Sequence, residues 1–146
     1  MNNHQVIPII GNEFSEKVMP LIQQAKDTID IIVYDWRWYP DQIGSAIQKF
    51  NNAIVVAAKK GVDVKAMTND FPTIDILNKN KVKARKLTSS RKVHVKLMII
   101  DGKTAVLGSH NYTMSAFTTN YEISIMTQEK EIVKRLKNFF TNLWPS

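Results

Sequence analysis

The sequence predicts an α/β protein in which a mixed β-sheet carries helices packed on both faces. Short runs rich in β-branched residues alternate along the chain with longer amphipathic segments, the order that is typical of this class. An Asp101-Gly102 pair between two apolar runs is a strong hairpin signal and adds an antiparallel pair of strands. The chain has 146 residues, about the length of one domain, so we expect residues 1–146 to form a single domain.

The first half of the chain predicts a strand–helix–strand–helix–strand order. We expect the strands at residues 6–10, 28–34 and 62–67. The run 28–34 is largely apolar, which indicates a strand buried on both faces. The first helix spans 13–27, where apolar residues recur at helical spacing, and Pro20 inside it predicts a kink or a later start. Pro40 opens the second helix near its first turn, and Gly61 caps its end after residue 60.

The second half predicts a series of strands followed by one long helix. We expect the strands at residues 81–87, 93–100, 104–107 and 123–126. Lysine alternates with apolar residues in 81–87, which is typical of an edge strand, where charge blocks unwanted pairing. Residues 69–80 indicate a loop with a short helix, and residues 129–143 an amphipathic helix.

Composition excludes several functional classes. The chain has no cysteine, which excludes disulfide scaffolds, cysteine-ligated zinc, iron–sulfur clusters and thiol catalysis. Its aliphatic runs fall far short of the roughly 20 residues of a spanning helix, so no stable membrane association is expected. Residues 1–5 are polar and unlike a secretory signal, which predicts a cytoplasmic protein. No cofactor and no metal site are predicted, because the first-half aspartates are scattered along separate elements.

Positive charge is concentrated in one segment. Lys and Arg outnumber Asp and Glu by 20 to 13. The segment 79–92 contains no acid and holds the whole excess: Lys79, Lys81, Lys83, Arg85, Lys86, Arg91 and Lys92. A basic stripe of this kind suits a polyanion such as nucleic acid or an acidic membrane surface, and the alternative is a solvated lysine face. We expect Lys81, Lys83 and Arg85 to contact phosphates.

A histidine and a lysine interrupt the apolar strand predicted at 93–100. His94 and Lys96 are two residues apart and therefore point to the same side of that strand. A two-residue hairpin turn, at 101–102 or at 102–103, places Ser109 and Asn111 on the same face, whereas a three-residue loop breaks this pairing. His110 has the opposite parity and is expected to face away.

The four side chains would form an anion site that contains a titratable group. Ammonium, hydroxyl and amide donors suit phosphate oxygens. The imidazole can act as a nucleophile or as a general acid and base near neutral pH. The alternative is that His94 is a hydrogen-bonded core histidine and that Lys96 extends outward to solvent.

The spacing of these residues resembles the signature of the phospholipase D superfamily, H-x-K-x4-D-x6-G-S-x-N. The matching positions are His94-x-Lys96, Asp101 and Gly108-Ser109-x-Asn111. Asn120-Tyr121-Glu122 is similar to a downstream element of that family. The order of helices and strands is similar to that of its small single-copy bacterial endonucleases, which implies a phospholipase D-like fold.

The resemblance implies a role for each matching residue. His94 would attack phosphorus and form a phosphohistidine, and Glu122 would hydrogen-bond the other ring nitrogen of that histidine. Asp101 would have a structural or orienting role. The residues that would hold the non-bridging oxygens are Lys96, Ser109 and Asn111.

The number of motif copies implies a partner. Members of the family use two copies of the motif, and the second histidine protonates the leaving oxygen. This chain has one copy, because neither His4 nor His110 sits in a second His-x-Lys, so the resemblance implies a homodimer. It predicts a metal-independent nuclease that cleaves DNA or RNA. The alternatives are a phospholipid hydrolase of the cardiolipin-cleaving type and a non-catalytic nucleic-acid-binding module.

An aromatic segment follows the second strand, where the related enzymes line their cleft. Trp36, Arg37 and Trp38 present ring and guanidinium planes on which bases could stack. The alternative is that Trp36 or Trp38 packs beneath the second helix.

Overall fold

A computed structural model describes residues 5–145, so the chain start at residues 1–4, His4 included, lies outside the described residues. The elements in chain order are β1 (Val6–Ile10), α1 (Glu13–Gln24), β2 (Thr28–Val33), α2 (Ala46–Lys59), β3 (Asp63–Thr68), α3 (Phe71–Lys79), β4 (Lys83–Lys86), β5 (Lys96–Ile100), β6 (Thr104–Gly108), α4 (Met114–Thr118), β7 (Ile123–Thr127) and α5 (Lys130–Leu143). The expected alternation of strands and helices is confirmed.

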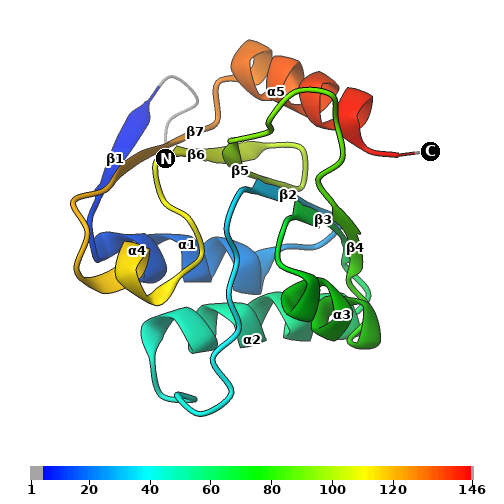
Figure 1. Cartoon of the computed structure of the whole chain (residues 1–146). Coiled ribbons are helices and arrows are strands. Elements are labelled where there is room, and N and C mark those ends of the chain that lie inside the picture. The colour runs from blue at the N-terminus through cyan, green and yellow to red at the C-terminus, as the bar shows by residue number, and fades with distance from the viewer. Residues whose placement is uncertain (1–4, 146) are drawn as a thin grey trace.

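The strands form one mixed sheet in the order β1-β7-β6-β5-β2-β3-β4. The β2–β3 and β3–β4 pairs are parallel, and the other neighbouring pairs are antiparallel. Figure 1 shows α1 and α2, together with α3 and α4, on one side of the sheet and α5 on the other. The prediction of a mixed sheet with helices on both faces is therefore confirmed.

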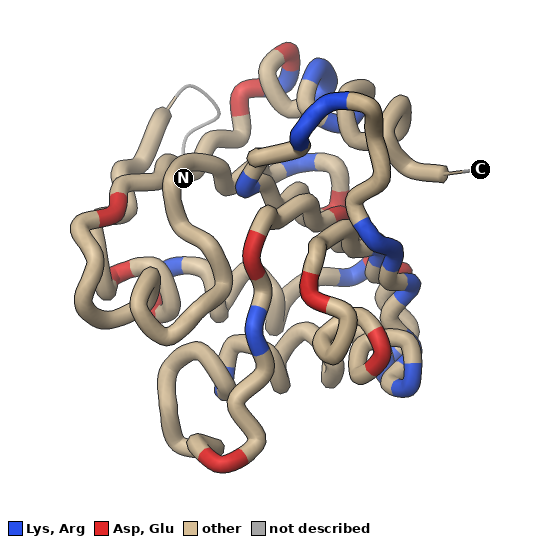
Figure 2. Tube along the Cα trace, viewed as in Figure 1, with Lys and Arg blue, Asp and Glu red and all other residues tan. Residues whose placement is uncertain are grey.

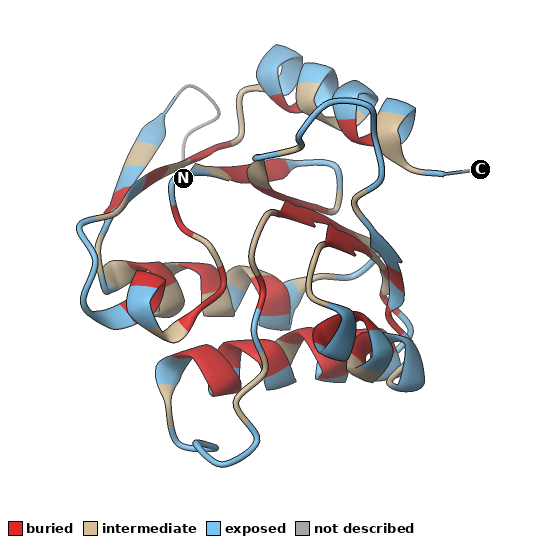
Figure 3. Ribbon diagram, viewed as in Figure 1, coloured by how far each residue is buried: buried red, intermediate tan, exposed pale blue. Residues whose placement is uncertain are grey.

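Strand β2 lies in the middle of the sheet and is buried on both faces, as its apolar run predicted (Figure 3). Ile31 belongs to the core beneath α1 and α2, whereas Ile32 packs with Phe140 of α5. Asp30 is only 1% exposed and forms an ion pair with Lys137 of α5. Because a buried carboxylate is costly without a partner, this pair helps to hold α5 on the sheet.

Several helices differ from the prediction. The second helix begins after Ser45 rather than at Pro40, because the Ser45 hydroxyl caps it by accepting the N–H of Gln48 at 3.3 Å. The first helix continues through Pro20 without ending there. The short helix expected within 69–80 forms as α3 and fills most of that region, and α4 forms where no helix was expected.

The β5–β6 hairpin has a three-residue loop, so both of the expected two-residue turns are wrong. Ile100 pairs with Thr104, which leaves residues 101–103 in the loop. Asp101 adopts a positive φ of 55°, and its carboxylate accepts the backbone N–H of Asp27 at 2.7 Å and of Thr28 at 3.1 Å. These bonds tie the loop to the connection before β2 and favour the longer turn.

Basic residues lie along β4 and along the loop that leads from β4 toward β5 (Figure 2). Strand β4 lies at the edge of the sheet, as its alternating lysines predicted. Among the helices formed by residues 5–145, none is long and apolar enough to cross a membrane.

Candidate active site

Apart from Asp101, the motif residues gather at one end of the strands, where β2 ends and β5 begins; this end is called the site edge of the sheet. Val33, the last residue of β2, pairs with Lys96, the first residue of β5. The expected strand at 93–100 begins only at Lys96, so His94 lies on the loop before it. Gly108 ends β6 at the same edge, next to this loop, because Leu97 pairs with Leu107.

His94 and Lys96 are in direct contact. The Lys96 Nζ lies 2.8 Å from His94 Nδ1 and donates to the His94 carbonyl oxygen at 3.1 Å. Since an ammonium can only donate, His94 Nδ1 accepts, and the proton of the neutral ring is on Nε2. The Tyr34 ring lies 4.4 Å from the His94 ring, and Lys92 Nζ lies 5.2 Å from the centre of the Tyr34 ring.

The charges around His94 favour its neutral form. The positive charge of Lys96 lowers the pKa of His94, and partial desolvation and Lys92 add to that effect. Desolvation lowers the pKa of Lys96 as well, and Lys92 acts in the same direction, whereas Glu122 opposes them. The imidazole is therefore available as a nucleophile near neutral pH, in surroundings that attract an anion.

Ser109 and Glu122 form the second part of the site. The Ser109 hydroxyl donates to Glu122 Oε1 at 2.5 Å and accepts the N–H of Ile123 at 3.0 Å. Asn120 donates to the other carboxylate oxygen of Glu122 at 3.0 Å. Within the chain Glu122 thus positions Ser109, and the implied bond from Glu122 to His94 stays a prediction.

Contacts of Gly108 and His110 with neighbouring parts of the chain hold the loop that carries Ser109 and Asn111 in place. A Cβ on Gly108 would lie 2.4 Å from Ser124 Cα, so only glycine fits there. The buried His110 ring donates from Nε2 to the Gly11 carbonyl at 2.8 Å and accepts at Nδ1 from Ser124 Oγ at 2.7 Å. His110 therefore faces away from the site and fixes the loop to the start of α1.

Asn111 connects this loop to the end of β2. Its Oδ1 accepts the backbone N–H of Asp35 at 3.1 Å. Tyr112 also donates its N–H to the Asp35 carbonyl at 3.0 Å. With the side-chain oxygen engaged in this way, the NH₂ group of Asn111 is the end that can donate to an anion. The chain beyond β6, and not the hairpin register, brings Ser109 and Asn111 to this edge.

Asp101 lies at the other end of β5 from His94. Burial would raise its pKa, but the N–H groups of Asp27, Thr28 and Lys26 outweigh burial and hold the pKa below its usual value. Its observed contacts are structural, in agreement with the structural role that the motif implied.

The expected nucleic-acid-binding residues do not surround His94. Trp36 is fully buried and donates from Nε1 to Asn51 at 2.7 Å, so it cannot stack a base, and Trp38 packs partly buried against the same core. Arg37 is bound by Asp35 at 2.7 Å and Asp70 at 3.2 Å.

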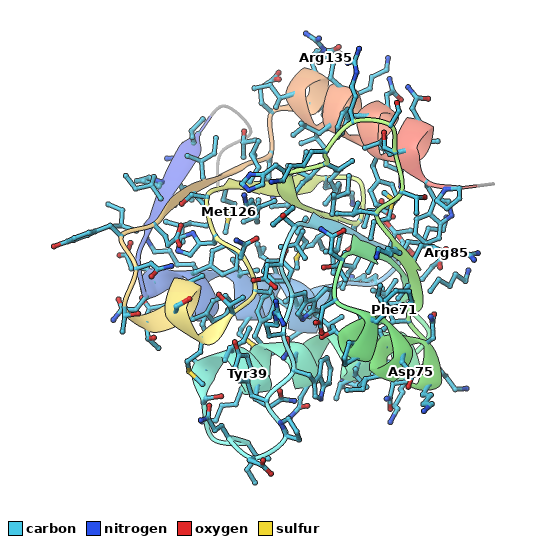
Figure 4. All side chains as sticks on the ribbon, in the orientation of Figure 1. Tyr39, Phe71, Asp75, Arg85, Met126 and Arg135 are labelled. Carbon is cyan, nitrogen blue, oxygen red and sulfur yellow. The ribbon has the colours of Figure 1, made fainter. Side chains whose placement is uncertain are left out.

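The basic segment is also divided by the fold. Lys81 precedes β4, and Lys83 is the first residue of that strand. Counted along β4, Lys83 lies three residues from the end of the sheet that carries the site. Lys83 also forms a salt bridge with Asp63 at 2.9 Å. Arg85 lies over the Trp144 ring at 5.5 Å, and Figure 4 shows it at the outer edge of the molecule. The expectation that the whole segment lies beside the reaction centre is therefore wrong. Lys81, Lys83 and Arg85 lie away from it, whereas Lys86 lies over the Phe71 ring, and Arg91 and Lys92 belong to the loop that leads to His94.

Two clefts flank His94 instead. One has a volume of about 490 Å³ and is lined by Tyr34, Asp35, Arg37, Asn69, Asp70, Phe71, Leu87, Ser89, Ser90, Arg91, Lys92 and Val93. The other, of about 540 Å³, is mainly apolar and is lined by His94, Val95, Lys96, Leu97, Leu107, Gly108, Leu136 and Phe139. Neither cleft was predicted from the sequence, although Lys92 lies only two residues before His94. Within the described part of the chain, no three His, Asp or Glu side chains come together in a way that could hold a metal ion.

Curated proteins similar to this chain include cardiolipin hydrolases. The mitochondrial cardiolipin hydrolase of Danio rerio is 32% identical over 103 residues, which are 66% of this chain and 45% of that protein. The protein of the same name from Xenopus tropicalis is 26% identical over 144 residues, 94% of this chain and 64% of that protein. This chain thus spans less than two thirds of the length of either relative.

Solved structures with the same fold include two bacterial proteins. NucT from Helicobacter pylori superposes with a TM-score of 0.76 at 19% identity, covering 95% of this chain and 94% of that one. The phospholipase D family member Nuc from Salmonella typhimurium superposes with a TM-score of 0.78 at 22% identity, covering 96% and 95%. The family model described as "Cardiolipin synthase, PLD-like domain" matches residues 18–144, and with the motif geometry at the sheet edge this shows that the chain belongs to the phospholipase D superfamily.

Proposed function

We propose that this chain is a metal-independent phosphodiesterase that cleaves nucleic acid through a covalent phosphohistidine. The contact between His94 and Lys96 at 2.8 Å carries the proposal, because it joins a neutral imidazole to a cation at an edge that also holds Ser109 and Asn111. In this proposal residues 1–146 form one catalytic domain.

In the first step a His94 nitrogen attacks phosphorus and the bond from phosphorus to the leaving oxygen breaks. A phosphate oxygen would draw the Lys96 ammonium away from Nδ1, which frees a ring nitrogen for attack. Lys96, Ser109 and Asn111 would donate to the non-bridging oxygens, whose negative charge otherwise repels a nucleophile. A proton donor must supply the proton that the leaving oxygen takes.

In the second step water attacks the phosphohistidine, and the group that protonated the leaving oxygen takes a proton from that water. The bond between phosphorus and nitrogen breaks, a phosphomonoester leaves and His94 is regenerated. Dividing the displacement in this way replaces one difficult step by two easier ones. Ammonium, hydroxyl and amide donors take the charge-neutralising part that a metal ion plays elsewhere.

We place the missing proton donor on a second copy of the chain. The chain contains one His-x-Lys, and its other described histidine, His110, is bonded on both ring nitrogens inside the fold. A two-fold homodimer would bring His94 of each copy to one phosphorus, so that one attacks while the other donates. NucT and Nuc, whose chains are of similar extent to this one, support the nuclease assignment.

A phospholipid hydrolase is the second candidate, and the apolar cleft beside His94 favours it. Leu107, Leu136 and Phe139 would suit an acyl chain, and the similar curated proteins are named cardiolipin hydrolases. The expected cytoplasmic location stays a prediction, since those relatives are named as mitochondrial.

Incubation with defined substrates in millimolar EDTA tests the proposal. Single-stranded oligonucleotides, duplexes and cardiolipin vesicles are compared for wild type and for His94→Asn. We expect oligonucleotide cleavage that persists in EDTA and is lost in His94→Asn. A strict requirement for added Mg²⁺ or Mn²⁺, or cleavage of cardiolipin with none of nucleic acid, contradicts the proposed nuclease.

A further inference from the structure

Phe71 is an exposed aromatic residue on the polar cleft beside the nucleophile. It is the first residue of α3 and 65% exposed, whereas Ile74 and Leu77 of the same helix are buried in the core. Its ring therefore adds little to the packing of α3. Figure 4 shows Phe71 at the start of that helix, below the end of β4. In proteins that bind single-stranded nucleic acid, aromatic rings along a positively charged groove serve as stacking surfaces for bases.

Two lysines lie over aromatic rings that line this cleft. Lys86 Nζ lies 4.8 Å from the centre of the Phe71 ring, and Lys92 Nζ lies 5.2 Å from that of Tyr34. The Tyr34 ring in turn lies 4.4 Å from the His94 ring. The cleft thus leads from the Phe71–Lys86 pair past Lys92 to the proposed nucleophile.

The positive charge in this region is available to a ligand. Among residues 5–145, Lys86, Arg91 and Lys92 form no salt bridge, whereas Arg37 on the opposite wall is bound by Asp35 and Asp70. Serine and asparagine side chains supply the remaining polar lining, at Asn69, Ser89 and Ser90. Such a wall suits sugar and phosphate groups and suits an acyl chain poorly.

We propose that this cleft binds the single-stranded nucleotides next to the scissile phosphate, with a base stacked on Phe71 and phosphates on Lys86, Arg91 and Lys92. The inference rests on the proposed nuclease function and adds a substrate class and a specificity residue to it. A base can stack on a protein ring only when it has left its neighbours in the helix, so the cleft selects single strands over duplexes.

The test compares Phe71→Ala with two matched variants. Phe71→Tyr retains a stacking ring, and Ile43→Ala removes an exposed apolar side chain, 73% exposed, from the loop before α2. The substrates are a single-stranded oligonucleotide, DNA or RNA, that wild type cleaves, its duplex, and bis(p-nitrophenyl) phosphate, which has no base.

We expect Phe71→Ala to raise KM for the single strand roughly 5- to 150-fold, the range that base–aromatic stacking supplies, with kcat nearly unchanged. In Phe71→Ala, hydrolysis of bis(p-nitrophenyl) phosphate stays within twofold of the wild-type rate. The KM of Phe71→Tyr for the single strand is close to that of wild type, and so is the KM of Ile43→Ala. Wild type prefers the single strand to the duplex.

Three outcomes overturn the inference and leave the nuclease intact. They are an unchanged KM for the single strand in Phe71→Ala, an equal loss on bis(p-nitrophenyl) phosphate, or a wild type that cleaves the duplex as well as the single strand. A wild type that cleaves cardiolipin vesicles and no oligonucleotide overturns the proposed function itself, and this inference with it.

Discussion

Replacing Gly108 by alanine should displace the loop that carries Ser109 and Asn111, and so lower activity, while leaving most of the sheet intact. The added Cβ would lie 2.4 Å from Ser124 Cα and 2.5 Å from the Ile123 carbonyl oxygen, whereas ordinary contact begins at 3.4 Å. The ends of β6 and β7 must therefore separate by about 1 Å. Ser109 exchanges two hydrogen bonds with Ile123 across this contact, so it would move with the strand end. Misplacement of a catalytic group by about 1 Å can cost about 100-fold in rate.

The assay is kcat/KM for Gly108→Ala on a substrate that wild type cleaves, measured well below the midpoint of thermal unfolding. Gly44→Ala is the matched control, because nothing lies within 4 Å of a Cβ at that position. We expect a loss of about 100-fold for Gly108→Ala and no change for Gly44→Ala. A Gly108→Ala enzyme within threefold of wild type would refute the reasoning that close approach of β7 sets the position of Ser109.

Three further predictions follow from other contacts. In mixtures of wild-type and His94→Ala chains that exchange freely, activity should follow the square of the wild-type fraction, and a linear fall would show that each chain works alone. Lys96→Met should raise the pKa of His94, as followed by NMR of the imidazole, because it removes the cation that disfavours the protonated ring; an unchanged pKa would show that the contact at 2.8 Å has no such effect. Lys137→Met leaves Asp30 buried without its partner and should lower the free energy of unfolding in urea by about 3–5 kcal/mol, whereas the Lys137→Met/Asp30→Leu double variant recovers most of it. A double variant as unstable as the single one would contradict the view that the unpaired Asp30 carboxylate causes the loss of stability.

The fold was largely predictable because hydrophobic patterning decides where strands lie. The strand at 6–10 forms at the expected residues, and β2 is buried on both faces as its apolar run indicated. The starts of helices were harder to predict than the strands. Pro40 and Ser45 are both residues that favour the start of a helix, and the choice between them depends on tertiary contacts. The loop before α2 is held by two hydrogen bonds that a local pattern does not reveal: Trp36 donates to Asn51, and Asn51 donates to the Arg37 carbonyl.

The residue types of the candidate site could be read from the spacing of the motif, but the geometry of the site could not. Residues 94–111 carry the donors and the imidazole, whatever the hairpin register. The three-residue loop arises from bonds between Asp101 and the chain around Asp27, more than 70 residues away in sequence. The assumption of a two-residue turn was therefore wrong, and the chain beyond β6 brings Asn111 into contact with the end of β2 instead.

The surroundings of His94 bear on which phosphodiester is cleaved, and they come from parts of the chain that no local motif connects. Leu136 and Phe139 of α5 line the apolar cleft, while Phe71 and Lys92 line the polar one. Trp36 was the more obvious aromatic candidate in the sequence, yet it is fully buried, whereas Phe71, which no motif singled out, is exposed. Motif spacing therefore indicates the family, and we expect the choice between a nucleotide and a lipid to depend on which of the two clefts the substrate enters.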